Sequence, residues 1–197
     1  MTEPTQTSDH DLLRRMQGGD EGAFLQLYRR RQGAVYRFAM QMSGSPQLAE
    51  DVTQDVFLAL MREPGRFDPQ RGSLVGYLYG IARNRVLHYL ESLHLPSAAW
   101  EGSDERTSPE PLAQRPDPLD DLTRREDIGR LRQAVLALPA RYREVVVLCD
   151  LHELDYAQAA ASLGCAVGTV RSRLHRARSL LLQKLRPSPV KVTSRAP

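Results

Sequence analysis

The stretch that decides the fold is residues 155–186, which read DYAQAAASLGCAVGTVRSRLHRARSLLLQKLR. Its Ala-rich start predicts a short helix from about Tyr156 to Leu163, and Gly164 begins a tight turn into a second helix, which we expect Thr169 to cap. Two short helices joined by a Gly-containing turn form the helix-turn-helix, which lays its second helix in the major groove of DNA. The apolar positions of the second helix share one face: Val170, Leu174 and Ala177.

The other faces of this second helix carry charge of one sign. No Asp or Glu occurs from Tyr156 to the end of the sequence, whereas a solvated helix usually mixes both signs for i,i+4 support. A solvated Arg-rich helix is the alternative, but motif and charge together favour contact with DNA phosphates. The residues expected to face DNA are Thr169, Arg171, Ser172, Arg173, His175, Arg176 and Arg178.

Length and charge suggest more than one unit. The 197 residues, 41% of them hydrophobic, are enough for one average domain or two small ones. Residues 1–91 are neutral, residues 92–129 carry four basic and nine acidic side chains, and residues 130–197 carry twelve basic and four acidic ones. A neutral block, an acidic Pro-containing strip and a basic block predict two modules with a linker between them.

The two cysteines, Cys149 and Cys165, lie in apolar helical contexts. With His152 and His175 they suggest a zinc site, but only the gap between Cys149 and His152 resembles a ligand spacing. Buried reduced thiols are the better interpretation, and we expect neither a metal nor a cofactor.

The sequence shows no sign of a membrane segment or leader. MTEPTQTSDH at the start lacks the basic residues and apolar run of a signal peptide. The longest purely apolar run, residues 145–149, is far too short to span a bilayer. We therefore expect a soluble intracellular protein.

Helical periodicity dominates the first half of the chain. Residues 8–11 (SDHD) predict a helix start, residues 18–20 (GGD) end that helix and cap the next, and residues 23–42 continue it. A third helix is expected over Pro46–Arg62, capped by Ser45. Its buried stripe at four-residue spacing is Leu48, Val52, Val56 and Leu60. Taken alone, the acidic opposite side fits an ordinary amphipathic surface helix, and it contains Glu50, Asp51, Gln54 and Asp55 with Leu58 beside them.

A loop and a second amphipathic helix follow. Residues 63–73 (EPGRFDPQRGS) hold two prolines and two glycines and predict a loop, and residues 74–90 (LVGYLYGIARNRVLHYL) predict a helix. Tyrosines interleaved with Arg and Asn suit single-stranded nucleic acid, where bases stack on rings. A core helix whose tyrosines are merely buried fits the composition equally well.

The remaining pattern completes an all-α fold of two small helical domains joined by a flexible acidic linker. Helices are expected over residues 128–138, ended by Pro139, and over residues 141–151, and no strand pattern occurs. The domains are expected at residues 8–91 and 126–186, with the linker at 92–125 and a flexible tail at 187–197.

Four stretches carry a resemblance to a known family. They are residues 24–39 (FLQLYRRRQGAVYRFA), 49–60 (AEDVTQDVFLAL), 67–90 (FDPQRGSLVGYLYGIARNRVLHYL) and 131–185, which contains GTVRSRLHRAR. In this order and spacing they resemble bacterial sigma factors of the sigma-70 family, specifically the compact two-domain ECF (extracytoplasmic function) group. By this resemblance they are, in turn, the start of the first sigma domain, the core-polymerase-binding helix, the segment that melts and reads the −10 promoter element, and the second domain with its −35-reading helix.

The resemblance implies a non-catalytic function, in which the chain binds core RNA polymerase, directs it to particular promoters and helps to open the duplex. It implies that the loop at residues 67–73 holds a flipped base, and that the −35 helix reads base edges and phosphates in the major groove. The residues implied to bind core polymerase are Asp51, Gln54, Asp55 and Leu58. Those implied to contact the −10 element are Phe67, Asp68, Arg71, Ser73, Asn84, Arg85, His88 and Tyr89.

The resemblance also implies binding partners, and the sequence departs from the family pattern at several positions. Promoter DNA, core polymerase and an anti-sigma protein are the expected partners, without direct insertion into a membrane. Tyr77 stands where many relatives have Trp, and His88 where many have an acidic residue; Glu91 begins a segment that in relatives is often basic. These differences bear on the −10 preference. Ala159, where relatives often carry Ile, bears on helix packing.

Two other classes compete. A DNA-binding regulator that never joins polymerase would need a sensor or dimerisation module in the first half, and the two amphipathic helices there argue against one. An enzyme is not expected, because the sequence has no carboxylate cluster with metal spacing, no nucleophile–base arrangement and no phosphate-cradling glycine loop.

Overall fold

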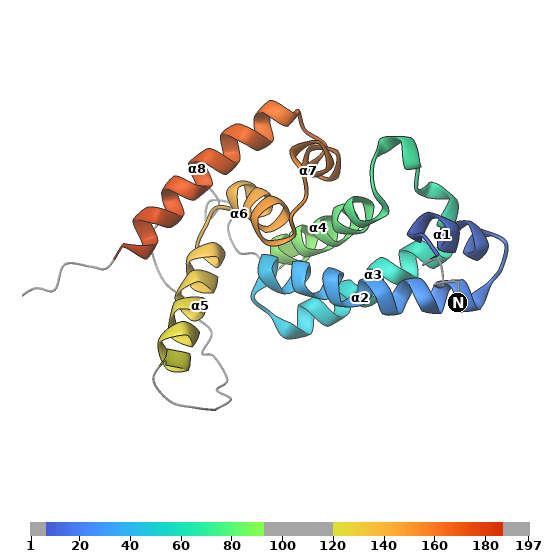
Figure 1. Cartoon of the computed structure of the whole chain (residues 1–197), viewed down its shortest axis with the longest axis horizontal. Coiled ribbons are helices and arrows are strands. Elements are labelled where there is room, and N and C mark those ends of the chain that lie inside the picture. Colours follow the sequence, from blue (N-terminus) through green and yellow to red (C-terminus); the bar gives the residue numbers. More distant parts are fainter. Residues whose placement is uncertain (1–6, 93–119, 187–197) are drawn as a thin grey trace, which may run out of the picture.

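The computed structural model describes residues 7–92 and 120–186. These ranges are helical and contain no strand, which confirms the all-α fold class (Figure 1). The α-helices are α1 (Asp9–Gln17), α2 (Glu21–Ser43), α3 (Pro46–Arg62), α4 (Leu74–Ser92), α5 (Asp120–Leu136), α6 (Ala140–Val146), α7 (Tyr156–Leu163) and α8 (Val167–Leu185). Single turns of other helix types are η1 (Pro64–Arg66), η2 (Pro69–Arg71) and the π-helical η4 (Val147–Leu151).

The first half is a bundle in which α2 packs against α1, α3 and α4. The predicted stripe of α3 is buried, since Val56 and Leu60 are fully covered and Leu48 and Val52 nearly so. Local signals set the helix starts: Ser8, Asp20 and Ser45 each accept a hydrogen bond from the backbone N–H three residues further on. The predicted cap at Ser45 is confirmed, and Ser8 and Asp20 fall within the segments 8–11 and 18–20 that were predicted to start helices.

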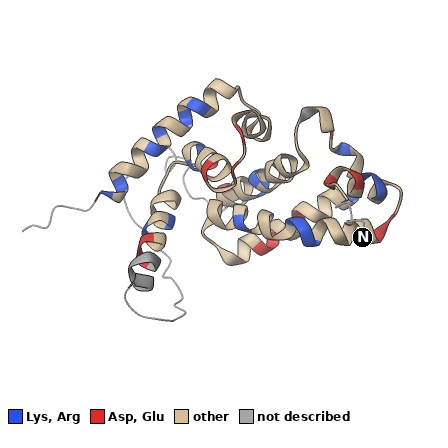
Figure 2. Cartoon of the chain, viewed as in Figure 1, with Lys and Arg blue, Asp and Glu red and all other residues tan. Residues whose placement is uncertain are grey.

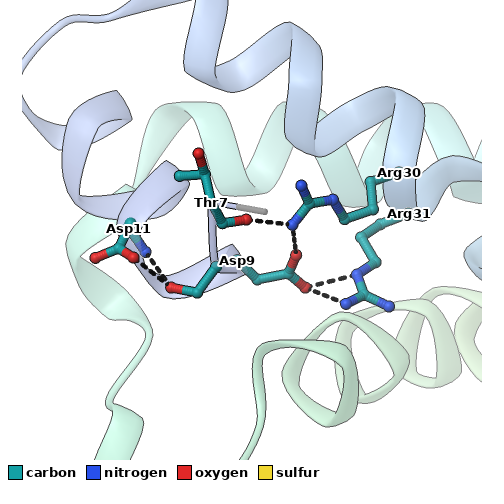
Figure 3. A network of polar contacts seen from close by, with 6 residues as sticks. Thr7, Asp9, Asp11, Arg30 and Arg31 are labelled. Carbon is teal, nitrogen blue, oxygen red and sulfur yellow. Dashed lines mark hydrogen bonds and ion pairs between the residues drawn. The ribbon is translucent and has the colours of Figure 1, made fainter. Parts of the chain in front are cut away.

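Asp9 fixes α1 to α2 (Figure 3). Its carboxylate lies 2.9 Å from Arg30 Nη1 and 2.6 Å from Arg31 Nε, and Arg30 also donates to the carbonyl oxygen of Thr7 at 2.7 Å. The Asp9 side chain is only 14% exposed. One carboxylate therefore neutralises two adjacent cations on α2 and holds the first helix against the bundle.

The second half packs α5, α6 and α7 against α8. Two predicted helix ranges need correction here. The helix expected at 128–138 begins earlier, at Asp120, and ends at Leu136. The helix expected at 141–151 spans 140–146 and then widens into the π-helical turn η4, which buries Val147 and Leu148.

The two halves pack directly against each other. Helix α4 lies beside α7, and the C-terminal end of α2 contacts α5, α6 and η4 (Figure 1). Arg143 on α6 donates to the backbone carbonyls of Met42, Leu136 and Leu138, and so links the C-terminal ends of α2 and α5. Burial lowers the pKa of Arg143 to about 10. The buried core is continuous across both halves. The predicted linker falls largely on residues 93–119, and the predicted tail on 187–197, outside the described residues.

Candidate nucleic-acid interface

Helices α7 and α8 form the predicted helix-turn-helix. The carboxylate of Asp155 accepts a hydrogen bond from the backbone N–H of Gln158. The side-chain oxygen of Gln158 accepts one from the backbone N–H of Asp155, and this reciprocal pair is a capping box. Gly164 ends α7 in the left-handed region, with φ +64, which glycine adopts without a Cβ clash. The N–H of Cys165 then bonds back to the carbonyl of Ala160 and closes the turn.

Thr169 is not the cap that the sequence suggested. The turn is complete at Cys165, so α8 begins two residues before Thr169, with Ala166 in the capping position and no side-chain cap. Thr169 lies in the first turn of α8, where it is half-buried. The predicted apolar face is confirmed, because Val170, Leu174 and Ala177 are buried.

The exposed side of α8 carries the predicted basic residues. Figure 2 shows Lys and Arg positions along α8 and no acidic one. Arg171, Ser172, His175 and Arg176 are exposed, and the Arg171 guanidinium lies 5.6 Å from the Tyr156 ring centre.

Two members of the predicted −35 set are partly engaged elsewhere. Arg178 Nη2 lies 2.6 Å from Asp150 Oδ1, an ion pair that ties α8 to η4. Arg173 is half-buried on the side of α8 that approaches Glu144, and its charge lowers the pKa of that carboxyl, although burial dominates and raises it.

A cleft of about 1000 Å³ gathers part of the predicted −10 set. Phe67 is buried, with its ring centre 5.5 Å from that of Tyr77, and Asp68 caps η2 by accepting from the Gln70 N–H at 2.9 Å. Ser73 caps α4 by accepting from the Gly76 N–H. The predicted residues that line the cleft are Phe67, Asp68, Ser73, Asn84 and Arg85.

The rest of the −10 set lies apart from that cleft. His88 and Tyr89 are exposed further along α4 and do not line it. Arg71 is the last residue of η2, and its side chain is outside the described part of the structure. The loop expected at 63–73 is more ordered than predicted, because prolines 64 and 69 each start a 3₁₀ turn.

The predicted core-polymerase-binding residues share the outer side of α3. Asp51, Gln54 and Asp55 are exposed and Leu58 is half-buried beside them. Asp55 Oδ2 lies 3.6 Å from Arg85 Nε on α4, so the acidic side of α3 adjoins the cleft that Arg85 helps to line.

Sequence reasoning missed four residues where the halves meet. Glu144 is 2% exposed and pairs with Arg83 of α4, and Tyr79 is buried and hydrogen-bonded to His152. Burial raises the pKa of Glu144, partly offset by Arg83, and lowers the pKa of His152 to about 4. Their partners are 61 and 73 residues away, so no local pattern could have found them.

No group of three or more His, Cys, Asp or Glu within the described ranges has a metal-binding arrangement. Cys149 and Cys165 are free and half-buried, and burial raises the pKa of the Cys149 thiol to about 11. Among the described helices, none combines the length and apolar character needed to cross a bilayer.

Comparisons with known proteins match both halves of this architecture. The family model for Sigma-70 region 2 matches residues 27–94, and the model for Sigma-70, region 4 matches residues 128–181. The ECF RNA polymerase sigma factor SigE of Mycolicibacterium smegmatis is 34% identical over 183 residues, covering 91% of this chain and 67% of its own. The RNA polymerase sigma-H factor of Pseudomonas aeruginosa is 30% identical over 189 residues, covering 93% and 96% respectively.

A solved structure shows the same arrangement of helices. The sigma factor RpoE of Bartonella quintana, solved in complex with the anti-sigma factor NepR, superimposes with a TM-score of 0.63 at 27% identity. The match covers 82% of this chain and 96% of that one. The fold, the order of the two matched regions and the relatives all indicate the same family. This chain belongs to the sigma-70 family of RNA polymerase sigma factors, in the ECF group.

Proposed function

We propose that this chain is a cytoplasmic, non-catalytic initiation subunit that binds core RNA polymerase through α3, opens and reads the −10 element with α4 and its preceding loop, and reads the −35 element with α8. Residues 8–91 and 126–186 are the two working domains in this proposal. One observation carries it: the same chain joins a helix-turn-helix whose exposed side lacks acidic residues to a region 2 bundle with an exposed acidic helix.

The −35 contact rests on the exposed residues of α8. Arg171 and Arg176 are placed to reach base edges or phosphates, and a bidentate Arg–guanine pair contributes about 1–3 kcal/mol of discrimination. Ser172 and His175 add shorter polar contacts, while Arg173, Arg178 and Thr169 have further roles in packing.

The −10 contact rests on the cleft between the 63–73 loop and α4. Phe67 and Tyr77 give it aromatic surface, and Asn84 and Arg85 give it hydrogen-bond donors. A base that leaves the duplex loses a few kcal/mol of stacking, which such a surface can offset. His88, Tyr89 and the Arg71 position extend this surface along the unwound strand.

The polymerase contact rests on the acidic outer side of α3, where Asp51, Gln54 and Asp55 surround the half-buried Leu58. A small apolar centre with a charged rim fits a basic groove on the polymerase. An anti-sigma protein is the further partner that we propose, because the related RpoE was solved with the anti-sigma factor NepR.

The test is transcription in vitro with purified core RNA polymerase and genomic DNA of the source organism, with and without this chain. New 5′ ends that appear only with the chain and share upstream elements would establish the function. No new starts, together with a shift of duplex DNA by the chain alone, would favour a regulator that acts without joining polymerase.

A further inference from the structure

The first helix of the chain is hydrogen-bonded to the loop at residues 63–73. Gln17, the last residue of α1, donates from Nε2 to the carbonyl oxygen of Pro64 at 2.9 Å, and the two residues are 47 positions apart in the sequence. Helix α1 also packs against η1, the turn that Pro64 begins. The first helix therefore touches the loop that is proposed to hold a base of the −10 element.

The Gln17 contact ties η1 to another helix, whereas the other polar contacts of this turn are local. Among the described residues, the Arg66 N–H donates to the carbonyl oxygen of Glu63, and Arg66 Nη1 lies 3.0 Å from Glu63 Oε2. Both of these charged side chains are well exposed, so their ion pair restrains the turn only weakly. The hydrogen bond from Gln17 is the polar contact that fixes η1 relative to the bundle.

The same turn leads directly into the −10 cleft. Glu63, Arg66 and Phe67 line the cleft, and Gln17 does not. Phe67 follows η1 immediately, and its buried ring lies 5.5 Å from that of Tyr77, centre to centre. A shift of η1 would move Phe67 relative to Tyr77 and change the shape of the cleft. Gln17 can therefore influence the cleft only through the loop, as a positioning residue.

Helix α1 is anchored well enough to act as a support. Leu12 and Leu13 are buried in the bundle. The Asp9 network fixes the start of the helix to α2 (Figure 3), and near its end Arg15 Nη2 lies 2.8 Å from Oδ2 of Asp20, the residue that caps α2. Both ends of α1 are thus tied to α2, so Gln17 presents its amide from a fixed base.

We propose that Gln17 is a positioning residue for base recognition in the −10 element. Through the carbonyl of Pro64 it sets the place of Phe67 in the cleft, and so the discrimination at the base that the loop captures. This inference rests on the proposed function, and it adds α1 to the elements that determine which promoters the chain reads. A helix that only stabilises the bundle would leave the base preference unchanged.

The test is binding of holoenzyme, assembled from core polymerase and the full chain, to labelled single strands of the −10 element. The strands come from promoters recovered with the wild type, and each carries one of the four bases at one varied position. Fluorescence anisotropy gives, for each position, the ratio of the dissociation constants for the least preferred and the preferred base. The captured position is the one with the largest ratio in the wild type.

Gln17→Met removes the N–H donor and keeps the length, neutral charge and helix preference of the side chain. The ratio at the captured position should fall about two- to tenfold, the factor that corresponds to the net contribution of one hydrogen bond. The ratios at the other positions and the affinity for −35 duplex should stay unchanged. Gln26→Met makes the same replacement at an exposed glutamine of α2, and this matched control should leave every ratio as it is.

An unchanged ratio at the captured position in Gln17→Met would overturn the inference. An equal loss at every position would also overturn it, because it indicates damage to the bundle rather than to the loop. Gln17→Lys supplies a donor of similar reach and should retain the ratio, although its charge raises the affinity for every strand. A loss as large as that of Gln17→Met would contradict a role for the hydrogen bond. Failure of the wild-type holoenzyme to distinguish bases at any position would instead count against the proposed function.

Discussion

Asp55 on α3 and Arg85 on α4 form an ion pair, with 3.6 Å between Oδ2 and Nε. Both side chains are half exposed, so the pair itself contributes about 0–1 kcal/mol. The pair connects two proposed binding surfaces, because Asp55 belongs to the proposed polymerase-binding surface and Arg85 to the proposed −10 surface. A polymerase cation that pairs with Asp55 would release Arg85 toward DNA.

Replacing Asp55 by Ala is expected to weaken binding to core polymerase about fivefold, or about 1 kcal/mol, since one charge contact at a partly exposed rim is lost. Fluorescence anisotropy of labelled chain titrated with core polymerase measures this. Asp127→Ala, which removes another exposed carboxylate paired with an arginine at 3.0 Å, is the control and should leave the affinity unchanged. Equal losses for both variants would argue that α3 is not the contact.

We expect substitutions of Arg176 and Arg178 to change affinity for DNA by different amounts, although the two residues lie only two positions apart on α8. Arg176→Ala is expected to lower affinity for −35 duplex by about 1–3 kcal/mol, or to reduce the salt slope by about one phosphate contact. Arg178→Ala should cost less affinity, because Asp150 already engages that guanidinium at 2.6 Å. Titration of a −35 duplex at several salt concentrations decides this, and the reverse order would show that the Asp150 pair opens on DNA.

Asp9→Ala is expected to lower the free energy of unfolding by about 1–3 kcal/mol, since Arg30 and Arg31 both lose the carboxylate that they share. Urea denaturation of the full-length chain measures the change. Asp11→Ala, whose contact with Arg14 is a long exposed one of 3.8 Å, is the matched control and should have a smaller effect. Similar losses for both would place the stabilisation in the helix start rather than in the Asp9 network.

We expect His152 to make the free energy of unfolding depend on pH. Burial lowers its pKa to about 4, with Arg37 adding to the effect, so between pH 6.5 and about 4 the unfolded chain binds a proton that the folded chain excludes. The free energy of unfolding should therefore fall as the pH drops through this range, by about 1–2 kcal/mol after allowance for the partly exposed ring. Above pH 6.5 this contribution is constant.

The measurement is urea denaturation of wild type and His152→Gln between pH 5 and 7. The variant should lose the slope that this histidine contributes. His175→Gln replaces an exposed histidine on α8 and should keep the slope of the wild type. A wild-type slope in His152→Gln would assign the dependence to other groups.

Much of the fold followed from local signals. Pro46–Arg62 was predicted with its bounds because a capping serine, a proline at the first position and a four-residue apolar stripe agree, and Tyr156–Leu163 followed from its Ala-rich run before a glycine. Thr169 was misplaced because side-chain propensity suggested a cap where the backbone of the turn had already closed. Local propensity yields to turn geometry there.

The junction could not be predicted in the same way. Tyr79 and Arg83 sit in a helix whose composition suited both nucleic acid and a core, and only a partner from the other half distinguishes these uses. Glu144 lies between Arg143 and the apolar run 145–149, and gives no sign of burial until Arg83 is placed beside it. Such pairs are specified by packing between distant segments, which single-sequence periodicity does not contain.

Arg143 and Arg83 place different demands on recombination between relatives. Arg143 reaches across the junction to a backbone carbonyl, that of Met42, and any residue that ends a helix there supplies the same acceptor. Arg83 needs the carboxylate of Glu144 in particular. A chimera that exchanges region 4 for that of another family member would keep the first contact only if the donor carries an arginine at the position of Arg143, and the second only if it carries an acid at the position of Glu144. The residues at those two positions would then decide which of the buried polar contacts between the two halves the chimera retains.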